Sequence, residues 1–230
     1  MNLLKLSTVL RYSNPLKGNR RAQEAFTNLF PNTDFHKVVL AAGAPPESKV
    51  DVLAPNKNIL AVYSTIENPE SGYSPLYDSY RTFHKIDDIT PKIVLTHHRQ
   101  TARGSYLGKG YERFHEQLKH IRDLGIHGIH IDSGAGDKDS GLNGFFTWPR
   151  FSFNGDLSIN HIKRLSQKIQ DRLKEGDRDF HNLFSIPGGP EEWREHGYDT
   201  GPLWFDPNPL SEHSKRFQEY YNKRKLKENK

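Results

Sequence analysis

A glycine-rich segment near the middle of the chain has the composition of a phosphate-binding loop. Residues 102–110 read ARGSYLGKG, and an amphipathic helical pattern follows directly. Glycine lets the backbone approach an anion closely, and the N–H groups at a helix N-terminus point toward it. Arg103 and Lys109 add positive charge. The segment matches neither G-x-x-x-x-G-K-S/T nor G-x-G-x-x-G, so it predicts phosphate binding without a Walker loop or a Rossmann fingerprint.

Three side chains could accept a proton from a reacting group. His97 and His98 are consecutive residues of a predicted strand, so they should face opposite sides of a sheet, and one of them should face a cleft. Glu67, just after the predicted strand 59–66, is the third candidate. For each of the three, the alternative is a side chain that fills the strand surface without taking part in chemistry.

A second pattern would suit a metal ion. His130 and Asp132 share one face of the predicted strand IHGIHID, while His127 points the other way, and Asp137 and Asp139 follow in the next loop. Imidazole and carboxylate groups are common zinc ligands, so this set would make the protein a metal-dependent hydrolase. The histidines are otherwise scattered and no H-E-x-x-H pair occurs. We therefore expect no metal and keep the hydrolase as an alternative.

The elements that position these residues follow from hydrophobic spacing. We expect helices over 18–30 and 111–124 and strands over 59–66, 80–86, 92–100 and 126–132. The second of these helices has the clearest pattern, with one apolar face made by Tyr111, Phe114, Leu118 and Ile121. The glycine-rich segment therefore lies between a strand and the helix that leads to the next strand. A densely aromatic stretch, FFTWPRFSF, occupies 145–153.

The character of the chain changes beyond Asn154. We expect one helix, capped by Asp156 or Ser158, with an apolar face made by Ile162, Leu165, Ile169 and Leu173, and a final helix from near Ser211. We therefore divide the chain into a core, 1–155, and a mostly helical extension, 156–230. Because Trp193, Trp204 and Phe205 are too apolar to stay in water together, the extension should pack on the core.

The order of these elements and two short motifs resemble the GNAT superfamily of N-acetyltransferases. There, a loop reading roughly R/Q-x-x-G-x-G/A joins the fourth strand to the third helix, and residues 105–110, SYLGKG, fit its two glycines. A later family motif, near Tyr-x-x-x-Gly-Phe, lines up with 148–153, and a variant with Trp and Arg looks similar to 143–153, NGFFTWPRFSF. The resemblance covers about residues 90–155. It implies an α/β (α+β) fold with a mixed, mostly antiparallel sheet flanked by helices, whose strands 92–100 and 126–132 lie parallel.

The resemblance also implies a function. The protein would transfer an acetyl group directly from acetyl-CoA to an amine acceptor, with the glycine-rich loop on the pyrophosphate of the cofactor. The residues that would contact acyl-CoA are Leu95, Thr96, His97, Arg103, Gly104, Ser105, Leu107, Gly108, Lys109, Gly110, Tyr111, Asn143 and Trp148. His97, His98 or Glu67 would serve as the base. The acceptor stays open between a small amine, a protein lysine or N-terminus, and an aminoacyl-tRNA.

Three positions depart from the family pattern. Trp148 replaces the Tyr that often protonates the leaving thiolate, and an indole N–H is too weak an acid for that role. Ser152 replaces the late glycine, and Ser105 stands where the family has Gln or Arg, although Arg103 precedes it. Cofactor binding stays plausible on this pattern. The alternative is a catalytically degenerate module that binds a partner.

Composition sets the remaining expectations. The chain has 230 residues, no cysteine and a hydrophobic content of 34%, which excludes a disulfide scaffold and thiolate chemistry. No apolar run approaches 18 residues and Met1–Leu10 lacks the continuous apolar stretch of a signal peptide, so we expect a cytoplasmic protein without membrane contact. The net charge is +5, and 212–230 holds seven basic and three acidic residues, a net of +4. This basic tail leaves a nucleic-acid contact open.

Overall fold

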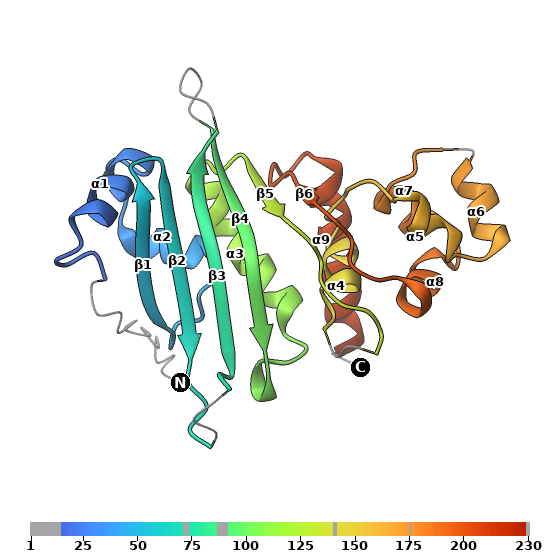
Figure 1. The fold of residues 1–230 in the computed structure, drawn as a ribbon, viewed down its shortest axis with the longest axis horizontal. Helices are drawn as coiled ribbons and strands as arrows, with labels where there is room; N and C mark the ends of the chain where they lie inside the picture. The colour runs from blue at the N-terminus through green and yellow to red at the C-terminus, as the bar shows by residue number, and fades with distance from the viewer. Residues whose placement is uncertain (1–14, 71–73, 87–91, 140–141, 175, 229–230) are drawn as a thin grey trace, which may run out of the picture. The chain divides into compact units, whose positions relative to one another are not determined.

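The computed structural model describes residues 15–70, 74–86, 92–139, 142–174 and 176–228. Its strands are β1 Lys49–Asn56, β2 Ile59–Ile66, β3 Tyr77–Lys85, β4 Ile93–Ala102, β5 Gly128–Ile131 and β6 Leu203–Phe205. They form one sheet in the order β1-β2-β3-β4-β5-β6 (Figure 1). The pairs β1–β2, β2–β3 and β5–β6 are antiparallel and β4–β5 is parallel. The predicted mixed α/β fold with a mostly antiparallel sheet is therefore confirmed.

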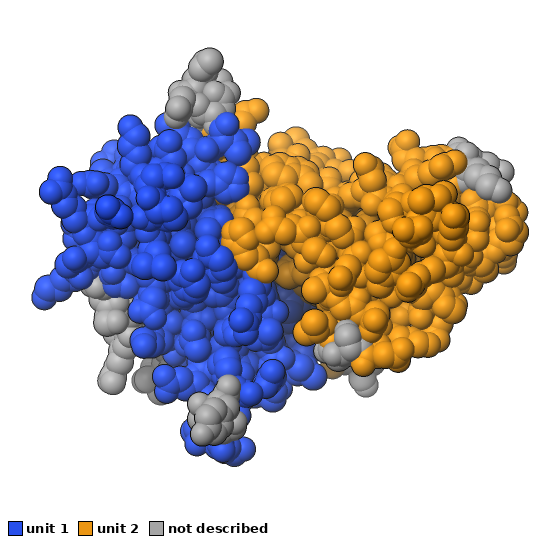
Figure 2. All heavy atoms as spheres, in the orientation of Figure 1, with its two compact units in different colours: residues 1–91, 99–124 blue, residues 92–98, 125–230 orange. Residues whose placement is uncertain are grey.

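The chain divides into two compact units (Figure 2). Unit 1 comprises residues 1–91 and 99–124, and unit 2 comprises residues 92–98 and 125–230. Strand β4 contributes its first part to unit 2 and its last part to unit 1. The division into a core ending at residue 155 and an extension beyond it stays a prediction.

Among its described residues, unit 1 has three α-helices, namely α1 Arg20–Leu29, α2 Phe35–Ala41 and α3 Gly110–Asp123. The side chain of Asn19 caps α1 by accepting a hydrogen bond from the Ala22 amide at 3.1 Å. Helix α1 packs on β1, β2 and β3, and α2 packs on α3. The apolar face predicted for α3 is buried. Packing of this face therefore fixes the helix that follows the glycine-rich segment.

The parallel pair expected from the sequence is present. Residues 94–97 of β4 pair with 128–131 of β5, and α3 is the helix that connects the two strands in sequence. Parallel neighbours need such a crossover. The predicted bounds of both strands and of the helix differ from the observed ones by one to two residues, which is the usual scatter at element ends.

Unit 2 holds six further helices within the described residues: α4 Gly144–Arg150, α5 Ile159–Lys163, α6 Gln167–Lys174, α7 Phe180–Ser185, α8 Gly189–His196 and α9 Glu212–Glu228. Trp193 of α8 is fully buried, and its indole N–H donates to the Phe145 carbonyl of α4 at 2.8 Å. Phe205 of β6 lies against Phe153, with ring centroids 5.1 Å apart. Aromatic packing thus joins residues 125–155 to the later helices of the same unit.

The single helix predicted from about Ser158 to Leu173 is wrong. The structure has two short helices there, because α5 ends at Lys163 and the Ser166 amide donates to a Glu192 carboxylate oxygen at 3.0 Å instead of continuing the helix. The four apolar positions are buried all the same. Their spacing fits two helices that share one core as well as it fits one continuous helix.

Two strands were not predicted from the sequence. In β1 exposed and buried residues alternate over 49–52, but Ala54 and Pro55 blur the pattern toward its end. Strand β6 has only three residues, too few for a periodicity. The opening segment, which we expect not to be a signal peptide, lies outside the described residues. Within the described part of the chain, no helix combines the length and the apolar character needed to cross a bilayer.

Candidate functional site

The glycine-rich segment is an exposed turn at the start of α3. Residues 104–106 form one turn of 3-10 helix, and Gly108 adopts a left-handed backbone with φ +77°. A Cβ built on Gly108 would meet nothing within 4 Å, so the requirement for glycine comes from the backbone conformation and not from crowding. The side chains of Arg103, Ser105, Leu107 and Lys109 are exposed.

The N-terminus of α3 presents its first amide groups at the end of this segment. Lys109 is the N-cap residue, and among the described residues no side chain caps the helix there. The first N–H groups of an α-helix have no acceptor within the helix and carry partial positive charge. The segment therefore offers an anion both backbone donors and the side chains of Arg103 and Lys109.

An aromatic and charged cluster, made by Glu47, Tyr77, Tyr106 and Arg113, includes Tyr106 of this segment. The Tyr106 hydroxyl donates to the Glu47 carboxylate, and the Arg113 guanidinium lies over the Tyr106 ring at 4.3 Å from its centroid and over the Tyr77 ring at 5.4 Å. Burial is the main cause that lowers the pKa of Arg113 from its usual value. Arg113 was not among the residues predicted from the sequence. The only feature that could have suggested it is its position in the first turn of the helix after the glycine-rich segment.

The parallel ladder between β4 and β5 is short. It ends at the pair His97–Ile131, although β4 continues to Ala102. Leu95, Thr96 and His97 are buried within β4. They could meet a ligand through backbone groups more readily than through side chains. The described ladder ends at His97 because β5 ends at Ile131.

His97 and Trp148, two predicted cofactor contacts, lie together in unit 2. Their rings meet edge to face with centroids 5.4 Å apart, and Trp148 also packs against Phe151 and Phe153. His97 is only 3% exposed. Because of this packing, His97 is part of an aromatic core. It is therefore less accessible to a substrate than His98.

His98 lies on the opposite face of β4 and meets Asp132, just after β5. The Nδ1 atom of His98 is 2.9 Å from Asp132 Oδ2, and Nδ1 of His130 is 3.5 Å from Asp132 Oδ1. The carboxylate therefore lies between two imidazoles. The side chains of His98 and His130 are 30% and 34% exposed, so solvent reaches both.

The contact between His98 and Asp132 was not predicted, although the sequence contains its signal in two separate patterns. Thr96 pairs with His130 across the parallel ladder, which puts position 98 beside position 132 on one face. The His130–Asp132 pattern of the metal hypothesis and the base candidate His98 thus belong to one constellation. Among the described residues, no three His, Asp or Glu side chains form a group that could hold a metal ion.

The remaining predicted residues are Glu67 and Asn143. Glu67 follows β2 in unit 1 and is exposed. Asn143 is the exposed N-cap residue of α4, and its backbone carbonyl accepts from the Thr147 amide at 2.9 Å. Residues 103–111 belong to unit 1, whereas Leu95, Thr96, His97, Asn143 and Trp148 belong to unit 2.

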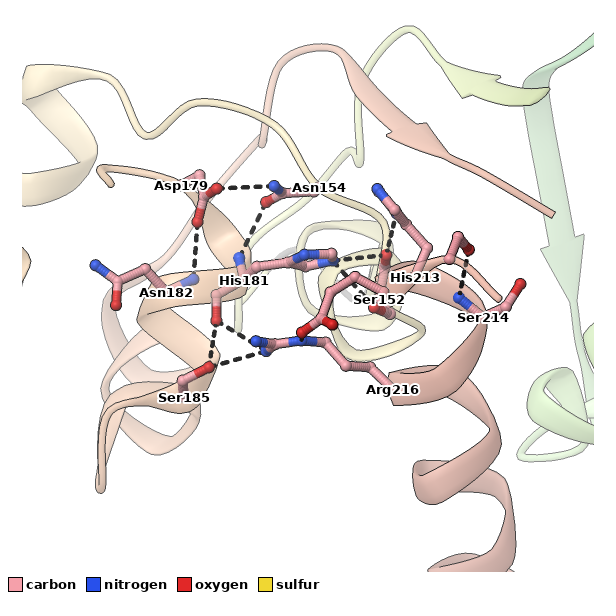
Figure 3. A network of polar contacts seen from close by, with 11 residues as sticks. Ser152, Asn154, Asp179, His181, Asn182, Ser185, His213, Ser214 and Arg216 are labelled. Carbon is pink, nitrogen blue, oxygen red and sulfur yellow. Dashed lines mark hydrogen bonds and ion pairs between the residues drawn. The ribbon is translucent and has the colours of Figure 1, made fainter. Parts of the chain in front are cut away.

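Ser152, at the late glycine position of the resembled motif, has a left-handed backbone with φ +68°. Few residues other than glycine adopt this conformation without cost. Glycine would suit the backbone conformation at this position, and glycine is the residue that the family pattern has there. Ser152 is 4% exposed and lies at the centre of a polar network (Figure 3).

Comparison with protein-family models and with curated proteins finds no match to this chain.

Proposed function

We propose that this protein is an acyl-CoA-dependent N-acyltransferase that moves an acetyl group directly from acetyl-CoA to an amine. The observation that carries the proposal is the parallel β4–β5 pair, whose ladder stops at His97 and Ile131 while β4 runs on. Ligands of open sheets bind at the carboxyl ends of parallel strands. A backbone amide near the carboxyl end of β4 would polarise the thioester carbonyl as an oxyanion hole does.

The segment 103–111 would bind the pyrophosphate. Gly108 supports the turn, the start of α3 supplies amide donors, and Arg103 and Lys109 supply charge. These are the features of anion sites at helix N-termini.

His98 is the base that the geometry favours over His97 and Glu67. When Nδ1–H donates to Asp132, the lone pair of the neutral imidazole is on Nε2, which is the nitrogen that can take a proton. A carboxylate that holds a histidine in one tautomer is the arrangement of a positioned general base. Asp132 would act through His98 as a positioning residue.

The reaction balances with these groups. The amine nitrogen attacks the thioester carbon, the new C–N bond forms, and the C–S bond breaks to release the thiolate of coenzyme A. The amine proton passes to His98, and the thiolate is protonated by the imidazolium or by water. A thiolate leaves readily near neutral pH, so the replacement of the family's Tyr by Trp148 does not prevent the reaction.

Binding of acetyl-CoA to matched variants at Gly108 tests the proposal. Asn and Asp have nearly the same size and both tolerate a positive φ better than other residues, so Gly108→Asn and Gly108→Asp differ mainly in charge. We expect calorimetric titration to show binding by the wild type and by Gly108→Asn, and a loss of affinity of tenfold or more, about 1.4 kcal/mol, in Gly108→Asp. Truncating Lys109 should cost less, about 1 kcal/mol.

Two results would contradict the proposal. One is equal affinity of all three proteins for acetyl-CoA, and the other is no binding by the wild type at millimolar ligand.

A catalytically degenerate binding module is the second candidate. The observation that favours it is the aromatic core around Trp148, which includes His97, Phe151 and Phe153 in place of a tyrosine able to donate a proton. Such a module would bind a partner, would have no reason to keep a tight site for acetyl-CoA, and would release no coenzyme A in the presence of any amine. Measuring thiol release beside the titration separates the two functions.

A further inference from the structure

Two histidines from different helices converge on one backbone carbonyl in unit 2. His181 of α7 places Nε2 3.0 Å from the Ser152 carbonyl oxygen, and His213 of α9 places Nδ1 2.8 Å from the same oxygen (Figure 3). The two ring centroids are 4.6 Å apart. Nε2 of His181 is also 3.0 Å from the Ser152 hydroxyl oxygen.

The carbonyl fixes the tautomers of both rings. A carbonyl oxygen only accepts, so His181 must carry hydrogen on Nε2 and His213 on Nδ1. One carbonyl has two lone pairs and can accept both bonds. Both bonds are satisfied by neutral imidazoles, and neither needs a protonated ring.

The charges around the pair are largely engaged elsewhere. Arg216 donates from Nη1 to the His181 carbonyl at 3.0 Å and from Nε to Glu212 at 2.6 Å. The Asp179 carboxylate accepts from Asn154 and from the Asn182 amide, and Asp206 accepts from the Asn208 amide. Among the described residues, the carboxylates that face the pair, Asp179, Asp206 and Glu212, therefore already have donors, while Arg216 adds a positive charge.

Burial is the first cause that lowers the pKa of both histidines from the usual value. For His181, the hydrogen bond to the Ser152 carbonyl opposes burial and raises the pKa. The positive charge of Arg216 lowers the pKa again, against smaller opposing effects of Asp179 and Glu212. For His213, the neighbouring His181 lowers the pKa further. The hydrogen bond to the Ser152 carbonyl and, less strongly, the charges of Asp206 and Glu212 raise the pKa. Protons thus bind these rings less readily in the folded chain than in the unfolded one.

We propose that Ser152, His181 and His213 form an acid-sensitive clamp that holds the first turns of α9 near neutral pH and releases them in mildly acidic solution. Protonation of both rings would place two cations side by side next to Arg216. Each protonated ring could still donate to the Ser152 carbonyl. Repulsion between the charges would nevertheless favour separating α9 from α7, which lets water reach both rings. Phe217, 1% exposed and packed on Phe151 with centroids 5.5 Å apart, is the apolar contact that the clamp protects. This device does not depend on the proposed acyltransferase activity.

Hydrogen exchange of the full chain tests the clamp. In the double variant His181→Gln and His213→Asn, amide N–H groups can donate to the Ser152 carbonyl but do not titrate. The exposed His127→Gln serves as the control. The measured quantity is the protection of amides in α9, corrected for intrinsic exchange rates and compared with that of α3. In the wild type and in the control, we expect this protection to fall on the order of tenfold between about pH 7.5 and 5.5. In the double variant the fall should be less than about twofold.

Equal loss of protection in α9 and α3 would overturn the proposal, as would an undiminished fall in the double variant. If the double variant does not fold, the single variant His213→Asn decides the question. It removes one of the two titrating rings and the repulsion between them, so an unchanged pH dependence in that variant would also overturn the clamp.

Discussion

His98 and Asp132 are the side chains on which the chemistry of the proposed reaction depends most directly. Their contact joins the residue just beyond the parallel part of β4 to the residue after β5. Neither residue alone distinguishes a base from an ordinary strand surface. The contact at Nδ1 is the reason for proposing His98 as the base, because a ring that donates from Nδ1 keeps its accepting lone pair on Nε2.

We expect His98→Gln to lower the turnover number about 10² to 10⁴-fold, which is the usual contribution of a general base. Asp132→Asn should lower it less and leave the KM for acetyl-CoA unchanged, because Asp132 only orients the ring. The assay is thiol release with a panel of a small polyamine, a lysine peptide and an aminoacyl-tRNA. His130→Gln is the matched control, since its ring lies 3.5 Å from the other oxygen of Asp132.

Nitrogen-15 NMR of the imidazole gives a readout that does not need an acceptor. In the wild type His98 should be mostly in the Nδ1–H form, and Asp132→Leu should shift it toward the mixture seen in free histidine. An unchanged tautomer in Asp132→Leu would remove Asp132 from the mechanism.

At the scale of elements, the sequence predicted best those segments in which periodicity and boundaries agree. The helix over 111–124 and the strand over 59–66 have both, and the structure confirms them. The stretch 158–173 has a helical period but contains Ser166, whose amide bonds to Glu192 from a distant segment. A tertiary contact of this kind leaves no trace in a local pattern.

The candidate site shows the same limit. The glycine-rich turn was predicted because it is local, whereas the Ser152 network was not, because His181 and His213 come from helices far apart in sequence. The pairing of His98 with Asp132 was within reach, since it needs only the register of two predicted parallel strands.

One close contact controls how β5 and β6 meet. The Trp204 ring of β6 covers Gly128 of β5 so closely that a built Cβ would lie 1.8 Å from Cη2 of the indole. We expect Gly128→Ala to destabilise the protein by about 1–3 kcal/mol, because the ring must move. Chemical denaturation measures this change.

The Trp204→Leu background should rescue most of that loss, since it removes the ring that the new methyl group strikes. A double-mutant cycle gives the coupling between the two positions. A coupling close to zero would mean that the strand, and not the indole, resists the methyl group.

At the scale of the whole molecule, four histidines of the described chain connect stability to pH. Burial is the first cause that lowers the pKa of His120, His161, His181 and His213 in the folded chain. Because the unfolded chain binds protons more readily at these positions, acid favours unfolding. Their contribution is complete above the ordinary histidine pKa of about 6.5 and is lost as pH falls through the lowered folded-state values.

We therefore expect the free energy of unfolding to rise with pH between about 5 and 7 and to level off above that range. Urea titrations at several pH values measure it. The double variant His181→Gln and His213→Asn should keep the part of the slope that comes from His120 and His161. A wild-type stability that is flat over this range would contradict the linkage.

The division of β4 between the two units limits how fragments of this protein can be designed. The chain leaves unit 1 after Pro91, returns after His98 and leaves again after Leu124. No single truncation point can therefore isolate either unit with all its residues. A fragment that ends at residue 124 carries the first part of β4 without the β5 strand that pairs with it, and one that begins at residue 125 carries β5 without β4. Separating the units requires a rearranged gene in which residues 92–98 are joined by a linker to the segment that starts at Gly125.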